Sequence, residues 1–402
     1  MYLRIMLHSP TISFLVPDIS SPTIGAALRL ATALKPHYST QIVGSDFGRG
    51  ICSMYRGRYP FTRVPAGRIY RYPDYWRERR RLAAAVKGDI VVAVKAFANT
   101  VPVAVLLKRS RGAKTFVYLD EWDGALWEQL SFKAKFDCLR RHWYHPLEAC
   151  HHGWVEKSIA QLDGVISTTT FLQHRFGGSI VHAGVDTERF KPQPETMRRA
   201  MREKLGLRDK RVIVFGGVVR PHKGVEEILA ALVVLGDDRN RLLVVGPLTE
   251  HLARIRSTPE GRRYIVVAGE PLDDPKGINA KVHQQMPLYL DAGDAVVLPL
   301  RDTSLARSQM PIKVFEAMAM AKPLIATAVA DLPLMLNGCG KIVPPSKIEA
   351  LASGIQELFA DPEAAQRMGA AAREKCIREY SREVTEKKVV EVVERIWKRG
   401  EG

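Results

Sequence analysis

The chain has 402 residues, more than one hydrophobic core usually organises, so we expect two domains. Hydrophobic residues make up 46% of it and charged residues 26%, without any low-complexity tract, which excludes a disordered or fibrous protein and is typical of a globular α/β protein. The formal net charge is +17, and most of the excess lies in residues 1–190, so we expect anionic partners there.

The five cysteines show neither CxxC nor zinc-ribbon spacing, which argues against a disulfide framework and a structural metal. The longest apolar run, residues 90–107, is interrupted by polar residues and is shorter than the ~20 residues of a membrane span. We therefore expect a cytoplasmic protein, with peripheral attachment to the inner face of the cytoplasmic membrane as an option.

Short apolar runs alternate with helical patterns along the chain, which predicts βαβ units and parallel sheets. In the first half the pattern predicts a helix that starts near Gly25. Strands are expected over residues 2–7, 40–43, 90–94, 115–119, 164–167 and 179–182.

Two segments of the first half depart from this alternation. Residues 49–81 contain ten arginines interleaved with aromatic side chains, which suits phosphate, anionic lipid or nucleic acid, and equally a solvated basic face. Residues 122–161 contain four histidines and two cysteines, but their spacing matches no standard zinc pattern. We predict a helical insertion there and no metal.

The turn-rich stretch 182–195 separates the two alternations. Strands in the second half are expected over residues 211–215, 241–245, 264–267, 295–299, 323–326 and 341–343. The predicted architecture is two doubly wound Rossmann-like domains facing a cleft, with a ligand at the carboxyl ends of the strands. The predicted domains are residues 1–188 and 189–380, followed by a helix over 381–402 that returns to the first domain.

Residues 212–235 predict a strand, a glycine-containing turn and a helix. Gly216 and Gly217 let the backbone approach a ligand, while Arg220 and Lys223 place two cations just before the helix. Since a helix N-terminus is itself electropositive, an anion between these groups would resolve the conflict.

The stretch "SQMPIKVFEAMAMAKPLIAT", residues 308–327, predicts a second anion site. Pro311 suits the first turn of a helix over 312–320, whose free amides near Met310, Ile312 and Lys313 can face a phosphate. Glu316 lies one turn further along, among residues that look buried, so it needs a partner such as a vicinal diol, a protein cation or backbone amides.

Four stretches together resemble glycosyltransferase family 4, which has the GT-B fold. The segment 308–327 is similar to the donor-binding segment of this family, and "FGGVVRPHKGVEEILAAL" to its diphosphate loop. "HAGVDTERFKP" resembles its interdomain turn, and "YSREVTEKKVVEVVERIW" its final helix. The resemblance covers most of residues 164–400 and implies a retaining transfer of a sugar from a nucleoside diphosphate.

Position by position, the resemblance implies that Glu316 binds the donor ribose and that Lys223 with Arg220 neutralises the diphosphate. It also implies phosphate binding around the stretch Ser308, Gln309, Met310, Pro311, Ile312 and Lys313. Ser308 stands where the family often has a second glutamate, and Gly217 where it often has an arginine. Gly25 is what remains of the glycine-rich loop after the first strand.

The family's catalytic histidine has no counterpart here. The predicted strand "TFVYL" runs into Asp120, Glu121 and Asp123 instead, so Asp120 and Glu121 are the catalytic candidates together with Arg220 and Lys223, and Asp123 is an acceptor-side candidate.

We expect a metal-independent hexosyltransferase without a cofactor, which uses a UDP or GDP sugar and a lipid-linked or cell-envelope glycan acceptor. Residues 49–81 are the expected contact with an anionic membrane surface. Two alternatives stay open: a nucleic-acid-binding or nucleic-acid-glycosylating protein of the same fold, and a nucleotide-sugar-binding protein without turnover.

Overall fold

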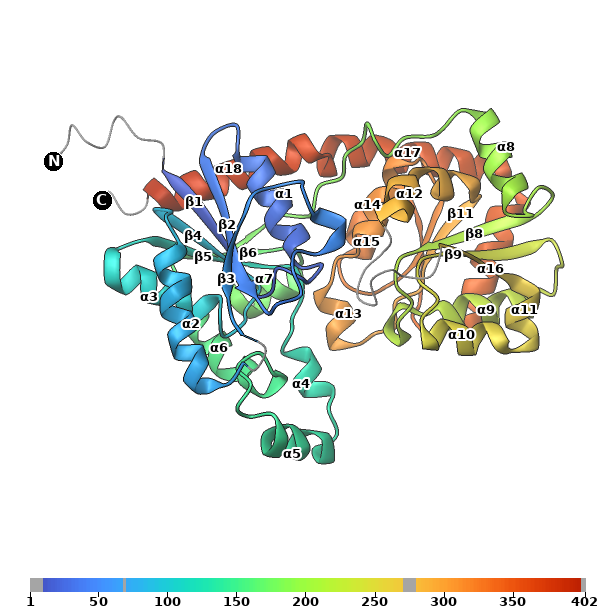
Figure 1. Ribbon diagram of the computed structural model, residues 1–402. Coiled ribbons are helices and arrows are strands. Elements are labelled where there is room, and N and C mark those ends of the chain that lie inside the picture. The colour runs from blue at the N-terminus through green and yellow to red at the C-terminus, as the bar shows by residue number, and fades with distance from the viewer. Residues whose placement is uncertain (1–9, 68–69, 270–279, 399–402) are drawn as a thin grey trace. The chain divides into compact units, whose positions relative to one another are not determined.

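The computed structural model describes residues 10–67, 70–269 and 280–398 (Figure 1). Contacts within the chain divide it into two compact units. The first unit comprises residues 1–182 and 385–402, and the second comprises residues 183–384. The boundaries expected from the sequence were 188/189 and 380/381. Each unit is an α/β Rossmann-like domain with its own parallel sheet.

The sheet of the first unit has seven parallel strands in the order β3-β2-β1-β4-β5-β6-β7. The strand order reverses between β1 and β4, so their carboxyl ends flank the position at which doubly wound sheets bind ligands. The strands are β1 (Thr11–Val16), β2 (Ser39–Asp46), β3 (Phe61–Pro65), β4 (Ile90–Val94), β5 (Lys114–Leu119), β6 (Gly164–Ser167) and β7 (Ser179–Ile180).

Two of these strands were not predicted. The expected first strand, residues 2–7, lies outside the described residues, and the central strand is β1, Thr11–Val16, which pairs with both β2 and β4. β3 lies within the basic segment and was not predicted, because Thr62 and Arg63 interrupt its apolar side chains. The other five expected strands are confirmed, although β7 is shorter than predicted.

Helices cover the first sheet so completely that β1 and β4 are almost entirely buried. They are α1 (Ile24–Leu34), α2 (Tyr72–Ala85), α3 (Val101–Arg111), α4 (Ala125–Gln129), α5 (Phe132–Arg141), α6 (His152–Ile159) and α7 (Thr170–Phe176), with short 3-10 turns η2 (Ser53–Tyr55) and η3 (Ala149–His151). Residues 122–161 are therefore a helical insertion, as expected, and Figure 1 shows α4 and α5 extending away from the sheet.

The final helix, α18 (Arg382–Lys398), belongs to the first unit from residue 385 onward, which confirms the expected return of the chain. Its buried face consists of Val389, Val392, Val393 and Ile396. A Cβ atom at Gly164 would lie 2.5 Å from the Cδ1 atom of Ile396, so only a glycine permits this close approach to β6.

The sheet of the second unit has six parallel strands in the order β10-β9-β8-β11-β12-β13. All six were predicted from the sequence. The strands are β8 (Arg211–Gly216), β9 (Asn240–Val245), β10 (Ile265–Ala268), β11 (Ala295–Leu298), β12 (Leu324–Thr327) and β13 (Lys341–Val343). Here the order reverses between β8 and β11, so a ligand crevice is expected at the carboxyl ends of these two strands.

Alternate residues of β8 enter two separate cores. Val212 and Val214 pack on the face with α12, α14 and α17, while Ile213 and Phe215 pack on the face with α9 and α16. The helices and 3-10 turn of this unit are α8 (Glu195–Lys204), η4 (Pro221–Lys223), α9 (Val225–Leu235), α10 (Glu250–Ser257), α11 (Pro259–Tyr264), α12 (Ala280–Ala292), α13 (Ser304–Ser308), α14 (Ile312–Ala319), α15 (Leu332–Met335), α16 (Ile348–Ala360) and α17 (Pro362–Tyr380).

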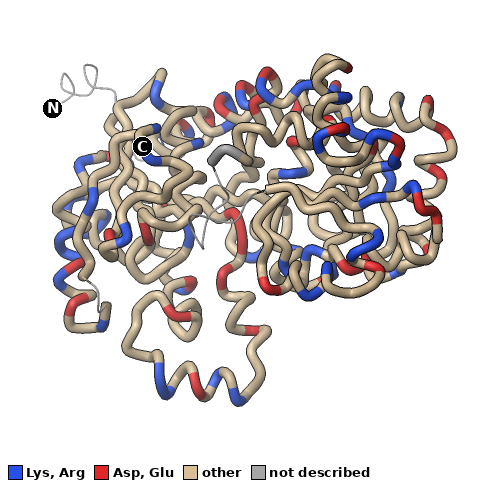
Figure 2. Tube along the Cα trace, turned by 45° about the vertical axis from the view of Figure 1, so that its right-hand side comes forward, with Lys and Arg blue, Asp and Glu red and all other residues tan. Residues whose placement is uncertain are grey.

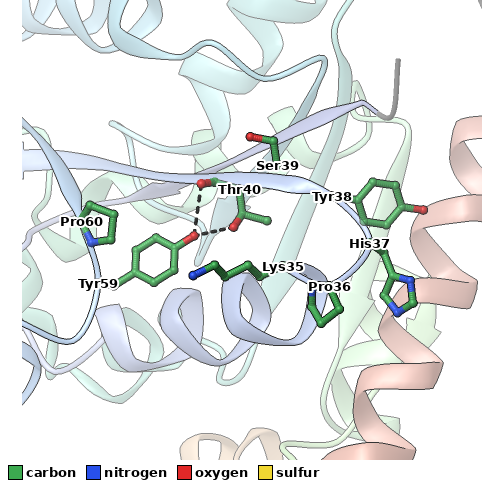
Figure 3. A pocket seen from close by; sticks show the side chains of 8 residues that line it. All are labelled: Lys35, Pro36, His37, Tyr38, Ser39, Thr40, Tyr59 and Pro60. Atoms are coloured by element: carbon green, nitrogen blue, oxygen red, sulfur yellow. Dashed lines mark hydrogen bonds between the residues drawn. The ribbon is translucent and has the colours of Figure 1, made fainter. Parts of the chain in front are cut away.

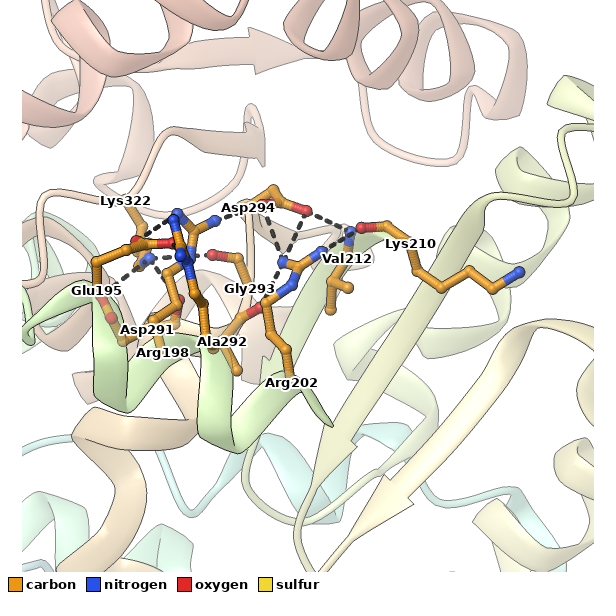
Figure 4. Close-up of polar contacts among 11 residues, drawn as sticks. Glu195, Arg198, Arg202, Lys210, Val212, Asp291, Ala292, Gly293, Asp294 and Lys322 are labelled. Carbon is orange, nitrogen blue, oxygen red and sulfur yellow. Dashed lines mark hydrogen bonds and ion pairs between the residues drawn. The ribbon is translucent and has the colours of Figure 1, made fainter. Parts of the chain in front are cut away.

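A polar network fastens α8 to the sheet of the second unit (Figure 4). Asp294, just before β11, accepts hydrogen bonds from Arg198 at 2.6 Å and from Arg202 at 3.1 Å, both on α8. The amide of Val212 donates to the same carboxylate at 2.8 Å. Buried Lys322 donates to the carbonyls of Asp291 and Gly293 at 3.0 Å. These charges are paired, so they belong to the scaffold.

None of the helices in the described parts of the chain combines the length and apolar character that crossing a bilayer would require.

Candidate functional site

The glycine turn after β8 lies at the switch point of the second sheet. Gly217 has φ +101° and its amide donates to the Val245 carbonyl at 2.8 Å, so the chain turns sharply at the strand end. Gly224, with φ +69°, immediately precedes α9, and an added Cβ would lie 2.0 Å from the Pro299 carbonyl oxygen after β11. The two loops that flank the switch point are therefore in direct contact.

The two cations of this turn have different surroundings. Lys223 ends η4 and its amino group donates to the Val218 carbonyl at 3.1 Å, which holds the side chain over the turn. Arg220 is exposed, just before η4. The structure thus brings Lys223 to the strand end and leaves Arg220 able to reach a ligand from solvent.

The second predicted segment begins α14. Pro311 is extended and immediately precedes Ile312, the first helical residue, so it lies before the helix rather than in its first turn as expected. Glu316 was expected among buried residues. It is half-buried, because it projects from the one side of α14 that the core does not cover.

The sequence predicted a role for the backbone amide of Lys313, and the structure adds its side chain to the site. Its Nζ atom is shielded from solvent and has no hydrogen-bond partner among the described residues. It lies 3.6 Å from the centre of the Phe215 ring, at the end of β8. Burial lowers the pKa of Lys313 well below its ordinary value, the charge of Lys223 lowers it further, and Glu316 opposes both effects. Two lysines and a helix N-terminus thus converge where an anion would stabilise them.

The remaining residues of this segment are mostly internal. Ser308 is fully buried, and its hydroxyl donates to the Leu305 carbonyl at 2.9 Å. The position at which the family often has a second glutamate therefore points into the core of this chain. Met310 is also buried, and Gln309 follows α13 in an extended conformation.

The carboxylates after β5 are gathered around Lys95, which directly follows β4. Lys95 is buried with φ +67°, an uncommon conformation for a residue with a side chain. Its amino group lies 3.3 Å from Asp123 Oδ1, 3.7 Å from Asp120 Oδ1, and in a hydrogen bond with Glu121. Burial opposes its charge, but the three carboxylates raise the pKa of Lys95 above its ordinary value.

Two of these carboxylates each have an oxygen that accepts no hydrogen bond from the described residues. Asp120 Oδ1 and Asp123 Oδ2 are buried atoms with no hydrogen-bond partner among the described residues. Burial raises the pKa of Asp123 above its ordinary value. The sequence signal for this cluster was a lone lysine directly after an apolar strand, and it could be interpreted only once β4 and β5 were known to be neighbours.

Gly25 does not lie in a loop. It is the second residue of α1, and an added Cβ would lie 2.3 Å from the Tyr55 hydroxyl oxygen. The expectation of a residual glycine-rich loop was wrong, because this glycine permits helix packing against η2.

Three histidines of the insertion, His145, His151 and His152, contact aromatic rings. His151 contacts the Tyr72 hydroxyl at 3.0 Å and the Trp143 carbonyl at 2.7 Å. Burial lowers the pKa of His152 to about 4. Within residues 10–67, 70–269 and 280–398, no three His, Cys, Asp or Glu side chains are grouped so as to hold a metal.

A hollow of about 500 Å³ lies at the amino end of β2 (Figure 3). It is lined by Lys35–Thr40, Tyr59 and Pro60, and the Tyr59 hydroxyl donates to the Thr40 carbonyl at 3.1 Å. The hollow lies at the amino end of the first sheet, whereas the Lys95 cluster lies at the carboxyl end, so the hollow is not part of that cluster.

Comparison with known proteins connects these features to chemistry. Residues 209–361 match the family described as glycosyl transferases group 1. Over 198 residues the chain is 30% identical to a GDP-mannose-dependent alpha-(1-6)-phosphatidylinositol monomannoside mannosyltransferase of Mycolicibacterium smegmatis, covering 47% of this chain and 49% of that protein. Over 189 residues it is 28% identical to alpha-D-kanosaminyltransferase of Streptomyces kanamyceticus, covering 45% of each. The chain spans about half the length of the curated relatives it matches.

Solved structures agree over nearly the whole chain. Sucrose-phosphate synthase from Thermosynechococcus elongatus superposes with a TM-score of 0.72 at 17% identity, covering 97% of this chain and 100% of that one. WaaG, a glycosyltransferase involved in lipopolysaccharide biosynthesis, superposes with a TM-score of 0.67 at 14% identity, covering 95% and 99%. At these identities the likeness concerns the fold.

Proposed function

We propose that this chain, which by its fold and by the family match of its second unit belongs to the GT-B glycosyltransferases, transfers a hexosyl group from a nucleoside-diphosphate sugar to an acceptor hydroxyl. The observation that supports the proposal most strongly is the amino group of Lys313, buried beside Phe215 with no acceptor among the described residues and with Lys223 nearby. A diphosphate would supply the missing negative charge.

Catalysis would come mainly from this electrostatic arrangement. As the glycosidic bond breaks, the leaving diphosphate gains negative charge next to Lys313, Lys223 and the first amides of α14, with Arg220 reaching it from solvent. Since these cations belong to the chain itself, we propose a metal-independent reaction with no cofactor beyond the nucleotide sugar. The assignment to family 4 and the retaining outcome rest on the resemblance of the donor segment.

Glu316 would bind the donor ribose. It lies one turn into α14, half-buried, and its charge also favours the protonated form of Lys313. A carboxylate that accepts hydrogen bonds from two neighbouring hydroxyls gains roughly 1.5 to 3 kcal/mol for each charge-assisted bond. Phosphate and ribose would then be held by the same helix.

The acceptor would be a lipid-linked or cell-envelope glycan. The mannosyltransferase similar to this chain is named for a phosphatidylinositol monomannoside, and WaaG for lipopolysaccharide biosynthesis. In the first unit, Asp120 and Asp123 each have a buried oxygen without a hydrogen-bond partner among the described residues, which would accept from an acceptor hydroxyl, and Lys95 fixes the cluster through ion pairs. We propose Asp120 and Glu121 as the catalytic carboxylates.

Incubation of the chain with a panel of UDP- and GDP-sugars, with detection of released UDP or GDP, tests this function. Release from one sugar, lost in Lys223→Ala and Glu316→Ala, is expected. Binding of nucleotide sugars without any release, with or without glycolipid acceptors, would leave a binding protein and overturn the enzymatic proposal.

A further inference from the structure

Helix α5, Phe132–Arg141, has its apolar side turned outward. Phe132, Phe136 and Leu139 are 86%, 60% and 51% exposed, and their spacing of four and three residues places them on one stripe. Cys138 is the buried residue of this helix, and it lies on the opposite side, next to Cys150. A helix of a globular protein normally buries such a stripe, so an exposed stripe marks a candidate interaction surface.

Cations border the stripe on both sides. On a helix with 3.6 residues per turn, Lys133 and Arg140 flank it on one side and Lys135 on the other, and Arg141 follows. Asp137, the one acidic residue of α5, lies away from the stripe, 3.9 and 3.8 Å from Arg140 and Arg141. Figure 2 shows these basic positions on the helix at the bottom of the view.

The exposed surface continues from α5 to α2. Trp143, two residues beyond α5 and 56% exposed, stacks on Tyr72 of α2 with ring centroids 6.4 Å apart. Trp76, one turn further along α2, is 53% exposed. Arg77, Arg80 and Arg81 of α2 are exposed as well. This part of the basic segment 49–81 therefore joins the α5 surface, whereas Arg49 and Arg63 are paired with Asp18 and Asp46.

We propose that the stripe of α5, with Trp143 and the exposed arginines of α2, is a docking surface for an anionic lipid membrane. Phenylalanine, leucine and tryptophan insert at the boundary between headgroups and acyl chains, and flanking lysine and arginine are attracted to anionic headgroups. Charge complementarity favours a membrane over a second copy of the chain. Two copies of this basic surface would repel each other, whereas an anionic bilayer supplies both an apolar layer and negative charge.

The surface and the proposed nucleotide site are built from different residues: α5 and α2 belong to the first unit and Lys313 to the second. A failure of membrane binding would therefore leave the proposed transfer reaction intact. A failure of nucleotide binding would likewise leave the membrane surface intact.

Flotation of the full chain with phosphatidylcholine vesicles, with and without phosphatidylglycerol, tests the proposal. The wild-type chain should bind the anionic vesicles, and added salt should release it. Phe132→Ser with Phe136→Ser should weaken binding by on the order of tenfold for each phenylalanine, because each loses its insertion into the apolar layer. The matched control, Val234→Ser with Leu334→Ser, removes two exposed apolar side chains of the second unit, 58% and 65% exposed, and should bind like wild type.

A second pair of variants separates charge from apolar contact. Lys133→Gln with Arg140→Gln should weaken binding to anionic vesicles by roughly tenfold or more, because each cation near the surface contributes about 1 kcal/mol. Arg199→Gln with Arg367→Gln, 78% and 70% exposed in the second unit, should not.

Unchanged circular dichroism and nucleotide affinity in all variants would show that they fold. Equal vesicle binding by the Phe132 and Phe136 variant and wild type would overturn the proposal. So would a wild-type chain that ignores anionic vesicles and forms a dimer that those substitutions abolish.

Discussion

At the residue scale, Lys313 determines how the second unit should respond to pH. In the folded chain without ligand, burial lowers the pKa of Lys313 well below its ordinary value of 10.5, whereas the unfolded chain keeps that value. Between these two pKa values the unfolded chain binds more protons, so the free energy of unfolding should rise with pH in that window.

Chemical denaturation from neutral to alkaline pH checks this expectation. Wild type should gain stability relative to Lys313→Met as the pH rises towards 10.5. Below the lowered pKa of Lys313, the variant should be the more stable of the two, because it lacks a buried unpaired charge. Parallel stability curves for the two proteins would contradict the assigned burial of Lys313.

Glu316 gives a second prediction at this scale. Glu316→Gln should raise the Kd of UDP or GDP by about tenfold, because it weakens the bonds from the ribose hydroxyls. Inorganic diphosphate, which has no ribose, should lose less affinity than either nucleotide. Calorimetric titration with both ligands measures the difference, and an equal loss for both would remove Glu316 from the ribose.

At the element scale, Gly224 couples the β8 turn to the loop after β11. Gly224→Ala should lower the free energy of unfolding by more than the ~1 kcal/mol expected of φ strain alone, since its Cβ would clash with the Pro299 carbonyl at 2.0 Å. Gly206→Ala is the matched control: its φ of +67° is nearly the same, but nothing lies within 4 Å. Equal losses in urea denaturation would show that the two loops tolerate separation.

The ends of β4 and β5 are joined by Lys95. Lys95→Met should lower the free energy of unfolding at neutral pH by roughly 3–5 kcal/mol, because it leaves partly buried carboxylates without their cation. The loss should shrink at acid pH, where the carboxylates are protonated, and in the double variant with Asp123→Asn. If Lys95→Met were as stable as wild type, the cluster would not be structural.

The strands of the second unit were predicted more completely from the sequence than those of the first unit. Every strand from β8 to β13 is a short apolar run bounded by turn residues, so periodicity alone found it. β1 was missed because "TISFLV" lies directly behind another apolar run, and β3 because polar residues interrupt it.

The two lysines of the clusters show what sequence could not supply. Lys95 follows β4 and its three carboxylates follow β5, and only the pairing of these strands brings them together. Lys313 meets Phe215, almost a hundred positions earlier, because β8 and the segment after β11 meet at the switch point. Local patterns located each segment, whereas strand order determined which side chains touch.

At the scale of the whole molecule, two parallel sheets each present a charged cluster at their carboxyl edge, with different signs. The second unit offers Lys313 and Lys223, and no described residue accepts a hydrogen bond from the Lys313 amino group, whereas the first unit offers three carboxylates around a single lysine. This asymmetry suits an anionic donor in one unit and a hydroxyl-bearing acceptor in the other.

The most direct test of the proposed donor site is a calorimetric titration of GDP and UDP into wild type and Lys313→Met. The control is Lys347→Met, which alters an exposed lysine before α16. Wild type and the control should bind at least one nucleotide equally well. Lys313→Met should raise its Kd by about tenfold to a hundredfold, as expected for the loss of a charge-assisted bond to phosphate. Equal affinity of Lys313→Met and wild type, or no binding by any of the three, would contradict the proposed donor site.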